Sequence, residues 1–196
     1  MKDYYKEIQG WFDFPDLYQK MIDLHKDGSI FVEIGVWKGK SAAYMAQKII
    51  ESNKKIELYC VDTWQGSKDE YTHINDPYVK SNSLYEHFKN NMKSFEGHYK
   101  PIVSDSVKAS ENFKNHSIDF VFIDAGHLYE QVKKDLQVWI EKVKPGGYIG
   151  GHDCNNKAIQ KAVNDIFPKA EVRKKKGKNR IGNSFLIKNE HNITAL

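Results

Sequence analysis

The chain has 196 residues, 40% of them hydrophobic and 29% charged, which suits one globular domain with a sizeable core and excludes an intrinsically disordered protein. No apolar run approaches the roughly 20 residues of a membrane helix, and the first residues lack the apolar core of a signal peptide. The two cysteines, Cys60 and Cys154, lack the spacing of a disulfide framework or a structural zinc site. We therefore expect a cytoplasmic protein that does not contact a membrane.

The formal net charge of +4 comes largely from one run, RKKKGKNR at residues 173–180. Such a run can contact phosphates, but a solvated turn between two strands is the simpler interpretation. Nucleic acid is therefore not the first partner that we expect.

Apolar runs bounded by turn residues alternate with segments of helical period. In chain order, strands are predicted at residues 29–35, 56–62, 99–105, 118–125, 144–153, 170–176 and 182–189. Helices are predicted at residues 40–52, 83–95, 106–115, 129–143 and 156–167, after an N-terminal helical lead over 1–28.

This alternation predicts an α/β fold, a Rossmann-like doubly wound, mostly parallel seven-stranded sheet with helices on both faces. The last two strands have no helix between them, so they should pair antiparallel as a C-terminal edge hairpin. No repeat or linker divides the chain, and we expect one domain over residues 1–196 with its core at 29–188.

Acidic residues stand at or just after the ends of the first five predicted strands. In open parallel sheets, ligands bind beyond the carboxyl ends of the strands. The recurrence of acids at that place predicts a site along one rim of the sheet, formed by Glu33, Asp62, Asp105, Asp124 and Asp153.

The first strand leads into a turn with two glycines and then into a helix. Gly35 allows a sharp turn without a Cβ clash, and Gly39 allows a ligand to approach the helix start. The third glycine of the dinucleotide fingerprint is absent, and Glu33 would repel a pyrophosphate. A carboxylate at this place suits a ligand that carries a positive charge or an amino group.

Several stretches together resemble the class I S-adenosylmethionine-dependent methyltransferases. VEIGVWKGKS resembles their first motif, which lies under the amino-acid part of the cofactor, and Asp62 matches the acid that binds the ribose hydroxyls. VDTWQGS, VSDS and FVFIDAGHLYEQVKKDLQVWIEKVKPGGYIGGHD resemble a small bacterial branch that includes macrolide sugar O-methyltransferases and relatives from cephalosporin biosynthesis. The resemblance covers roughly residues 30–153.

The resemblance implies a set of residues that contact S-adenosylmethionine. Those after the third strand would contact the adenine, and Trp64 would lie beside the cofactor. Alternatively, Ser104 or Ser106 only caps a helix, and Trp64 only roofs the core. The implied set is Glu33, Gly35, Trp37, Gly39, Ser41, Asp62, Thr63, Trp64, Ser104, Asp105, Ser106 and Asp124.

Asp124 and His127 form a D-x-x-H motif after the fourth strand, and Asp153 ends the fifth. In metal-dependent members of the branch, such aspartates hold Mg²⁺, and the histidine resembles their general base. An ordinary histidine pKa near 6.5 suits that role. His152 stands where relatives carry an acid, and imidazole favours a transition metal over Mg²⁺. The alternative is that the two aspartates only form hydrogen bonds.

The segment from Lys68 to Ser83 lies where a loop should overhang the site, and we interpret it as a mobile substrate-binding lid or an ordinary loop. The other histidines of the middle region have no partner motif and are interpreted as surface or core-edge residues; they are His73, His87, His98 and His116.

The favoured function is an S-adenosylmethionine-dependent O-methyltransferase acting on a small-molecule hydroxyl such as a sugar, with His127 as the base. A divalent metal, Mg²⁺ or a transition metal, would be held by Asp124, Asp153 and His152. The alternatives are a nicotinamide-dependent oxidoreductase and a non-catalytic cofactor- or RNA-binding protein. A homodimer is compatible with the sequence.

Overall fold

The strands form one mixed sheet in the order β3-β2-β1-β4-β5-β7-β6. The computed structural model describes residues 3–67, 70–168, 171–173 and 184–190. Within these residues, six strands have four residues or more and β6 adds a three-residue edge. The strands are β1 (Ile30–Ile34), β2 (Glu57–Asp62), β3 (Lys100–Val103), β4 (Ile118–Ile123), β5 (Val143–Gly151), β6 (Glu171–Arg173) and β7 (Ser184–Lys188).

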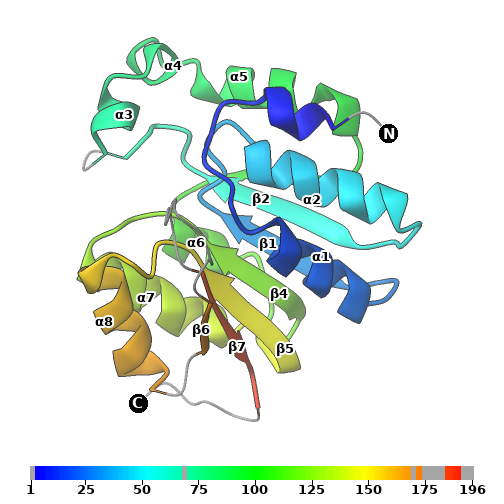
Figure 1. Ribbon diagram of the computed structural model, residues 1–196, viewed down its shortest axis with the longest axis vertical. Helices are drawn as coiled ribbons and strands as arrows, with labels where there is room; N and C mark the ends of the chain where they lie inside the picture. Colours follow the sequence, from blue (N-terminus) through cyan, green and yellow to red (C-terminus); the bar gives the residue numbers. More distant parts are fainter. Residues whose placement is uncertain (1–2, 68–69, 169–170, 174–183, 191–196) are drawn as a thin grey trace.

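Helices cover both faces of the sheet (Figure 1). One face carries η1, α1, α2, α5 and η2, and the other carries α6, α7 and α8, while α3 and α4 lie beyond the carboxyl ends of the strands. The bounds are η1 (Tyr4–Glu7), α1 (Pro15–Leu24), α2 (Lys40–Glu51), α3 (Tyr71–Ile74), α4 (Pro77–Lys80), α5 (Leu84–Asn91), η2 (Lys93–Phe95), α6 (Ser106–Ser110), α7 (Tyr129–Ile140) and α8 (Lys157–Ile166).

The predicted Rossmann-like architecture is confirmed. Strands β1 to β5 pair in parallel, and β7 pairs antiparallel with both β5 and β6. The basic turn predicted at 173–180 lies outside the described residues except for the backbone of Arg173. The longest helices, α2 and α7, have 12 residues each, and none in the described part of the chain could cross a bilayer.

Alternating side chains of the central strands enter two separate cores. In β1, Phe31 packs with α1 and α2, whereas Val32 and Ile34 pack with α6, α7 and α8. Both faces of the strand are therefore covered, which explains why the central runs contain few polar residues. Glu33 shares its face with Phe31, so its side chain points toward α2.

Three predicted helices end earlier than expected, and one of them, α7, stops at Ile140 instead of residue 143. The segment 83–95 divides into α5 and η2, and α6 stops at Ser110 instead of continuing to residue 115. The hydroxyl of Ser110 donates to the carbonyl of Val107, and the amide of Asn112 donates to the carbonyl of Ala109. These side-chain bonds compete with helical backbone bonds, which favours an early end.

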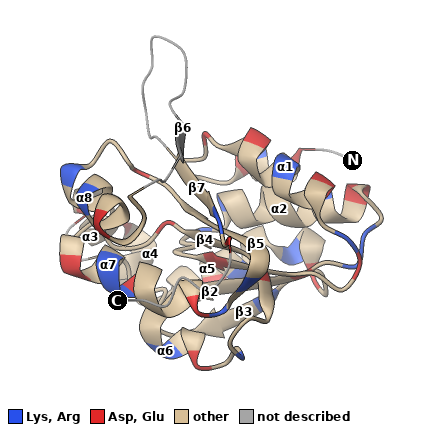
Figure 2. Ribbon diagram, turned by 90° about the horizontal axis from the view of Figure 1, so that it is seen from below, with Lys and Arg blue, Asp and Glu red and all other residues tan. Residues whose placement is uncertain are grey.

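Charged residues are interspersed on the outer surface. In the view of Figure 2, Lys and Arg segments lie among Asp and Glu segments on the described ribbon, and no described element is basic along its whole length.

Candidate active site

A cavity of about 890 Å³ opens at the carboxyl ends of the parallel strands. The chain order reverses between β1 and β4, which is the place where open α/β sheets bind ligands. Paired positions bring the strand ends level, with Ile34 beside both Val61 and Ile123, and Ile123 beside Gly151. Eight of the predicted cofactor-contact residues line the cavity: Gly35, Trp37, Asp62, Thr63, Ser104, Asp105, Ser106 and Asp124.

Asp62 is fixed by the backbone at the end of β2. Its Oδ2 accepts a hydrogen bond from the Trp37 amide at 2.7 Å, and its Oδ1 accepts one from the Trp64 amide, also at 2.7 Å. Burial raises the pKa of Asp62, although these backbone donors oppose that rise. The remaining lone pairs of a carboxylate held in this way can accept from two neighbouring hydroxyls, as on a ribose.

The turn after β1 depends on its glycine. Gly35 has φ +84°, and a Cβ there would overlap the backbone carbonyl of Asp124. Only glycine allows the ends of β1 and β4 to approach so closely. Trp37 follows in the left-handed region with φ 48°, a strained conformation of a kind that clusters at functional sites.

Trp37 is the central ring of an aromatic stack beside this turn. The ring of Trp37 stacks on Trp11 with centroids 5.3 Å apart and on His73 with centroids 5.0 Å apart. His73 also lines the cavity, so it lies closer to the site than its sequence surroundings indicated. The indole Nε1 of Trp37 is buried and has no hydrogen-bond acceptor among the described residues.

Four predicted cofactor-contact residues do not line the cavity. The space beside Gly39 is filled by Phe88 and Met92, so the interpretation that a ligand approaches there is not supported. Trp64 is buried against Tyr85 and Phe88, as expected for a residue that roofs the core. The other two are Glu33 and Ser41.

Glu33 is fully buried, and its Oε1 accepts a hydrogen bond from the hydroxyl of Ser41. Its Oε2 and the nearby hydroxyl of Tyr18 are both buried without a well-formed hydrogen bond among the described residues. Burial raises the pKa of Glu33 to about 8, because the Ser41 hydrogen bond only partly offsets the loss of solvation. This geometry does not support direct contact between Glu33 and a ligand in the cavity.

The residues after β3 divide their roles. The carboxylate of Asp105 caps α6 by accepting from the Lys108 amide at 3.0 Å. The hydroxyl of Ser106 accepts from the indole Nε1 of Trp139 at 2.9 Å. Both residues line the cavity, yet part of their hydrogen-bonding capacity is used within the fold.

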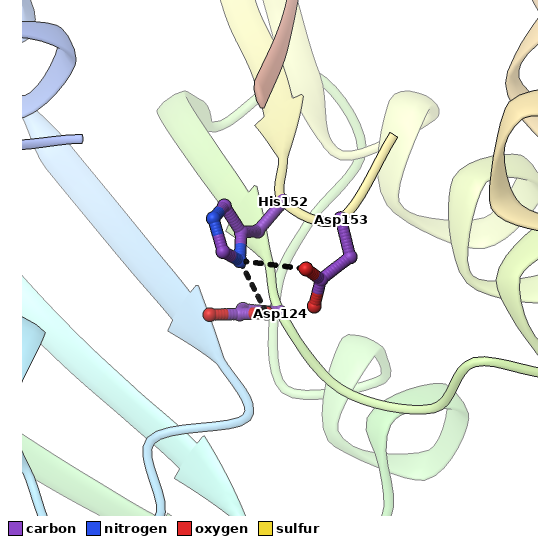
Figure 3. Close-up of side chains that lie close together, drawn as sticks. All are labelled: Asp124, His152 and Asp153. Carbon is purple, nitrogen blue, oxygen red and sulfur yellow. Dashed lines mark ion pairs between the residues drawn. The ribbon is translucent and has the colours of Figure 1, made fainter. Parts of the chain in front are cut away.

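Asp124, His152 and Asp153 converge beyond the ends of β4 and β5 (Figure 3). The Nδ1 atom of His152 lies 3.6 Å from Oδ1 of Asp124 and 3.4 Å from Oδ1 of Asp153. One ligand atom from each residue fits within 4.8 Å of the others, which is compatible with a shared divalent ion. Asp153 also has φ 55°, in the left-handed region.

A residue from the N-terminal lead completes this cluster. The Nε2 atom of His152 lies 2.9 Å from Oδ1 of Asp13, and Oδ2 of Asp13 is buried without a partner among the described residues. A carboxylate on the far nitrogen is the arrangement that orients a metal-binding histidine. The residues present therefore fit a metal ion, although a single imidazole in the set does not select one metal.

The electrostatics of the cluster are dominated by mutual attraction. Burial disfavours protonation of His152, but Asp124 and Asp153 outweigh that effect and raise its pKa to about 11. Burial would raise the pKa of Asp153, yet hydrogen bonds with His127 and His152 hold it well below its ordinary value.

His127 is held between two carboxylates. Its Nε2 lies 3.2 Å from Oδ2 of Asp153, and its Nδ1 lies 3.0 Å from Oε1 of Glu70. The hydrogen bond with Asp153 raises the pKa of His127 above 6.5, although burial opposes the rise. His127 borders a small pocket that shares Asp124 with the large cavity, so it lies next to the cavity and not inside it.

The predicted lid begins outside the described residues at 68–69 and continues through α3 and α4. Lys38, which is 1% exposed, forms an ion pair with Asp76 at the start of α4 and donates to Gln9 at 2.7 Å. The segment is therefore tied to both the β1 turn and the N-terminal lead. Whether it moves stays a prediction.

Comparisons with known proteins agree with this geometry. A family model described as a methyltransferase domain matches residues 32–154. The uncharacterized protein y4gI of Sinorhizobium fredii is 27% identical over 126 residues, a match that covers 62% of this chain and 13% of that protein. The chain thus spans only a small part of this curated relative.

Solved structures share the fold at low identity. SMU.1697c of Streptococcus mutans, in complex with SAH, has a TM-score of 0.62 and 9% identity over 91% of this chain and 99% of that one. An rRNA methylase from Streptococcus thermophilus has a TM-score of 0.61 and 10% identity, and the match covers 92% of this chain and 99% of that one. The O-methyltransferase NovP has a TM-score of 0.57 and 17% identity, and the match covers 87% of this chain and 78% of that one.

These neighbours differ in the acceptors that their names state, so the shared fold does not select an acceptor. The family model, in contrast, spans β1 to the end of β5, including Asp62, Asp124 and Asp153. The chain belongs to the methyltransferase-domain family.

Proposed function

We propose that the chain is an S-adenosylmethionine-dependent O-methyltransferase that acts on a hydroxyl group of a small molecule. The observation that carries the proposal is the adjacency of two sites that share Asp124. One is a nucleoside-sized cavity with Asp62 at its wall, and the other is the cluster of Asp153, His152 and His127.

The cavity residues would bind and orient the donor. The bound cofactor would supply an electrophilic methyl group on a sulfonium centre. Asp62 would accept from the ribose hydroxyls, and the Gly35 turn would lie along the amino-acid part. Holding both reactants in line removes much of the entropic barrier to transfer.

We assign proton removal from the acceptor hydroxyl to His127. A base ends that step as an imidazolium, and Asp153 and Glu70 stabilise the imidazolium because each places a carboxylate within 3.2 Å of a ring nitrogen. The hydrogen bond with Asp153 fixes the orientation of the ring, and Nδ1, which forms no hydrogen bond with a described residue, is the nitrogen that would take the proton. The two carboxylates raise the pKa of His127, and a raised pKa favours the imidazolium that proton transfer produces.

Asp124, Asp153 and His152 would hold a divalent metal, whose charge would lower the pKa of a bound hydroxyl. Asp13 would keep Nδ1 of His152 directed at the two aspartates. A mixed oxygen and nitrogen set suits Mn²⁺, Fe²⁺ or Zn²⁺ better than Mg²⁺.

The test separates binding from turnover. His127→Gln should leave the affinity for S-adenosylhomocysteine within about threefold of the wild type, since His127 does not line the cavity. Transfer of radiolabelled methyl groups to a panel of sugars, nucleosides and catechols should fall by roughly 10²–10⁴-fold. The matched control is His98→Gln, because His98 is exposed and lies outside both pockets.

Equal loss of binding and turnover in His127→Gln would contradict the assignment. Methylation of RNA or of amines, with no hydroxyl in the panel methylated, would contradict the proposed acceptor. A nicotinamide-dependent reaction, the earlier alternative, has no support from the family match.

A further inference from the structure

A second buried acid faces the cavity from α7. Asp135 is 6% exposed and lines the cavity, and the motifs assigned no role to it. It is not part of the cluster of Asp124, His152 and Asp153, since its side chain interacts with Ser106 at the start of α6. A buried carboxylate is costly unless donors surround it, so its partners decide its role.

The hydroxyl of Ser106 forms a hydrogen bond with the carboxylate of Asp135. That hydroxyl already accepts from Trp139 Nε1, which leaves its single proton for Asp135. Among the described residues, no Lys, Arg or His forms an ion pair with Asp135. Burial raises its pKa to about 6, because the Ser106 hydrogen bond only partly offsets the loss of solvation.

The cavity leads from Asp62 to Asp135. Its wall passes from the end of β2, through the turn after β3, to α7, and Val107 and Leu128 give it apolar sides. A nucleoside with its ribose at Asp62 would therefore extend its base toward α6 and α7. The more obvious acid, Asp105, is exposed, and one of its carboxylate oxygens caps α6.

We propose that Asp135, assisted by Ser106, recognises the 6-amino group of the donor's adenine. The inference rests on the proposed function and deepens it. An amino group is a donor that the buried carboxylate of Asp135 can accept from, whereas a 6-oxo group would face Asp135 acceptor to acceptor. Asp135 thereby selects adenosine over inosine derivatives.

The test compares S-adenosylhomocysteine with S-inosylhomocysteine, in which a 6-oxo group replaces the amine, by isothermal titration calorimetry at pH 7.5. The wild type should bind the adenosyl compound roughly 10-fold or more tightly. Asp135→Asn should lower that affinity about 10-fold and reduce the preference, because the Asn amide can donate to the 6-oxo group. Glu141→Gln, an exposed acid directly after the same helix and outside both pockets, should keep the wild-type preference.

An unchanged preference in folded Asp135→Asn would overturn the inference and leave the proposed function intact. If that variant does not fold, the wild type still decides, since equal affinity for the two compounds would overturn the inference. No binding of S-adenosylhomocysteine to the wild type would overturn the proposed function and the inference together.

Discussion

The buried carboxyl of Glu33 makes the stability of the fold depend on pH. In the folded chain its pKa is raised from 4.5 to about 8, mainly by burial, with the Ser41 hydrogen bond opposing the rise. The unfolded chain has the ordinary value. Below pH 4.5 the residue is neutral in both states, and it costs no stability there.

As the pH rises from 4.5 through about 8, the unfolded chain loses its proton before the folded chain does, so stability falls. Each pKa unit corresponds to about 1.4 kcal/mol, so the loss reaches about 5 kcal/mol above pH 8 and about 3 kcal/mol at pH 7. These are upper values, because water that enters a locally opened core would reduce them.

Glu33→Gln removes this titration and keeps an acceptor for the Ser41 hydroxyl. The free energy of unfolding, measured by urea titration between pH 5 and pH 9, should be nearly equal for variant and wild type at pH 5. The variant should be progressively more stable at higher pH.

A matched control is Glu57→Gln on the exposed start of β2. Hydrogen bonds with Lys100 and Tyr59 lower the pKa of Glu57, so its substitution should have the opposite sign or no effect. A difference between Glu33→Gln and wild type that does not change from pH 5 to pH 9 would refute the reasoning.

Three further changes test the site. Gly35→Ala should abolish S-adenosylhomocysteine binding and lower the melting temperature, because the new Cβ would overlap the Asp124 carbonyl. The control Gly28→Ala has φ +80° but open space around it, so it should lower the free energy of unfolding by only about 1–2 kcal/mol, and equal effects of the two variants would contradict the close-approach argument. Lys38→Met should lower the free energy of unfolding, measured by chemical denaturation, by about 3–5 kcal/mol, because it leaves the buried charge of Asp76 without its ion pair. Adding Asp76→Leu should restore much of this stability, and no restoration would argue against the ion pair as the cause. Asp13→Asn should weaken Mn²⁺ binding, followed by electron paramagnetic resonance, by about 10–100-fold, while unchanged binding would exclude Asp13 from orienting His152.

The architecture and the rim of acids could be predicted because both follow from local patterns. Strand runs of few polar residues indicate a sheet covered on both faces, and parallel strands bring their ends to one edge. Asp62, Asp105 and Asp124 accordingly line the cavity, and Asp153 lies beside Asp124.

The direction of Glu33 could not be read from its place at a strand end. It shares the face of Phe31, and only the packed helices show that this face is closed by α2. The surroundings of Trp64 and Gly39 could not be read from the sequence for a similar reason, since the side chains around them come from α5 and its C-terminal end.

Asp13 and Glu70 were missed because they reach the site from segments that carry no recognisable motif, and Asp135 was missed although it lies inside the stretch that resembles the methyltransferase branch. Asp13 lies in the N-terminal lead and contacts His152 across 139 positions of sequence. Asp135 lies within a helix whose apolar period indicated only packing. Long-range contacts of this kind depend on how elements dock, which one sequence does not reveal.

A crystal structure of the protein with S-adenosylhomocysteine would test the central claim most directly. The ribose hydroxyls should lie within hydrogen-bonding distance of Asp62, and the sulfur should lie on the Asp124 side of the cavity. A ligand bound elsewhere, or an empty cavity at a saturating concentration of the compound, would contradict a donor site at the carboxyl ends of these strands.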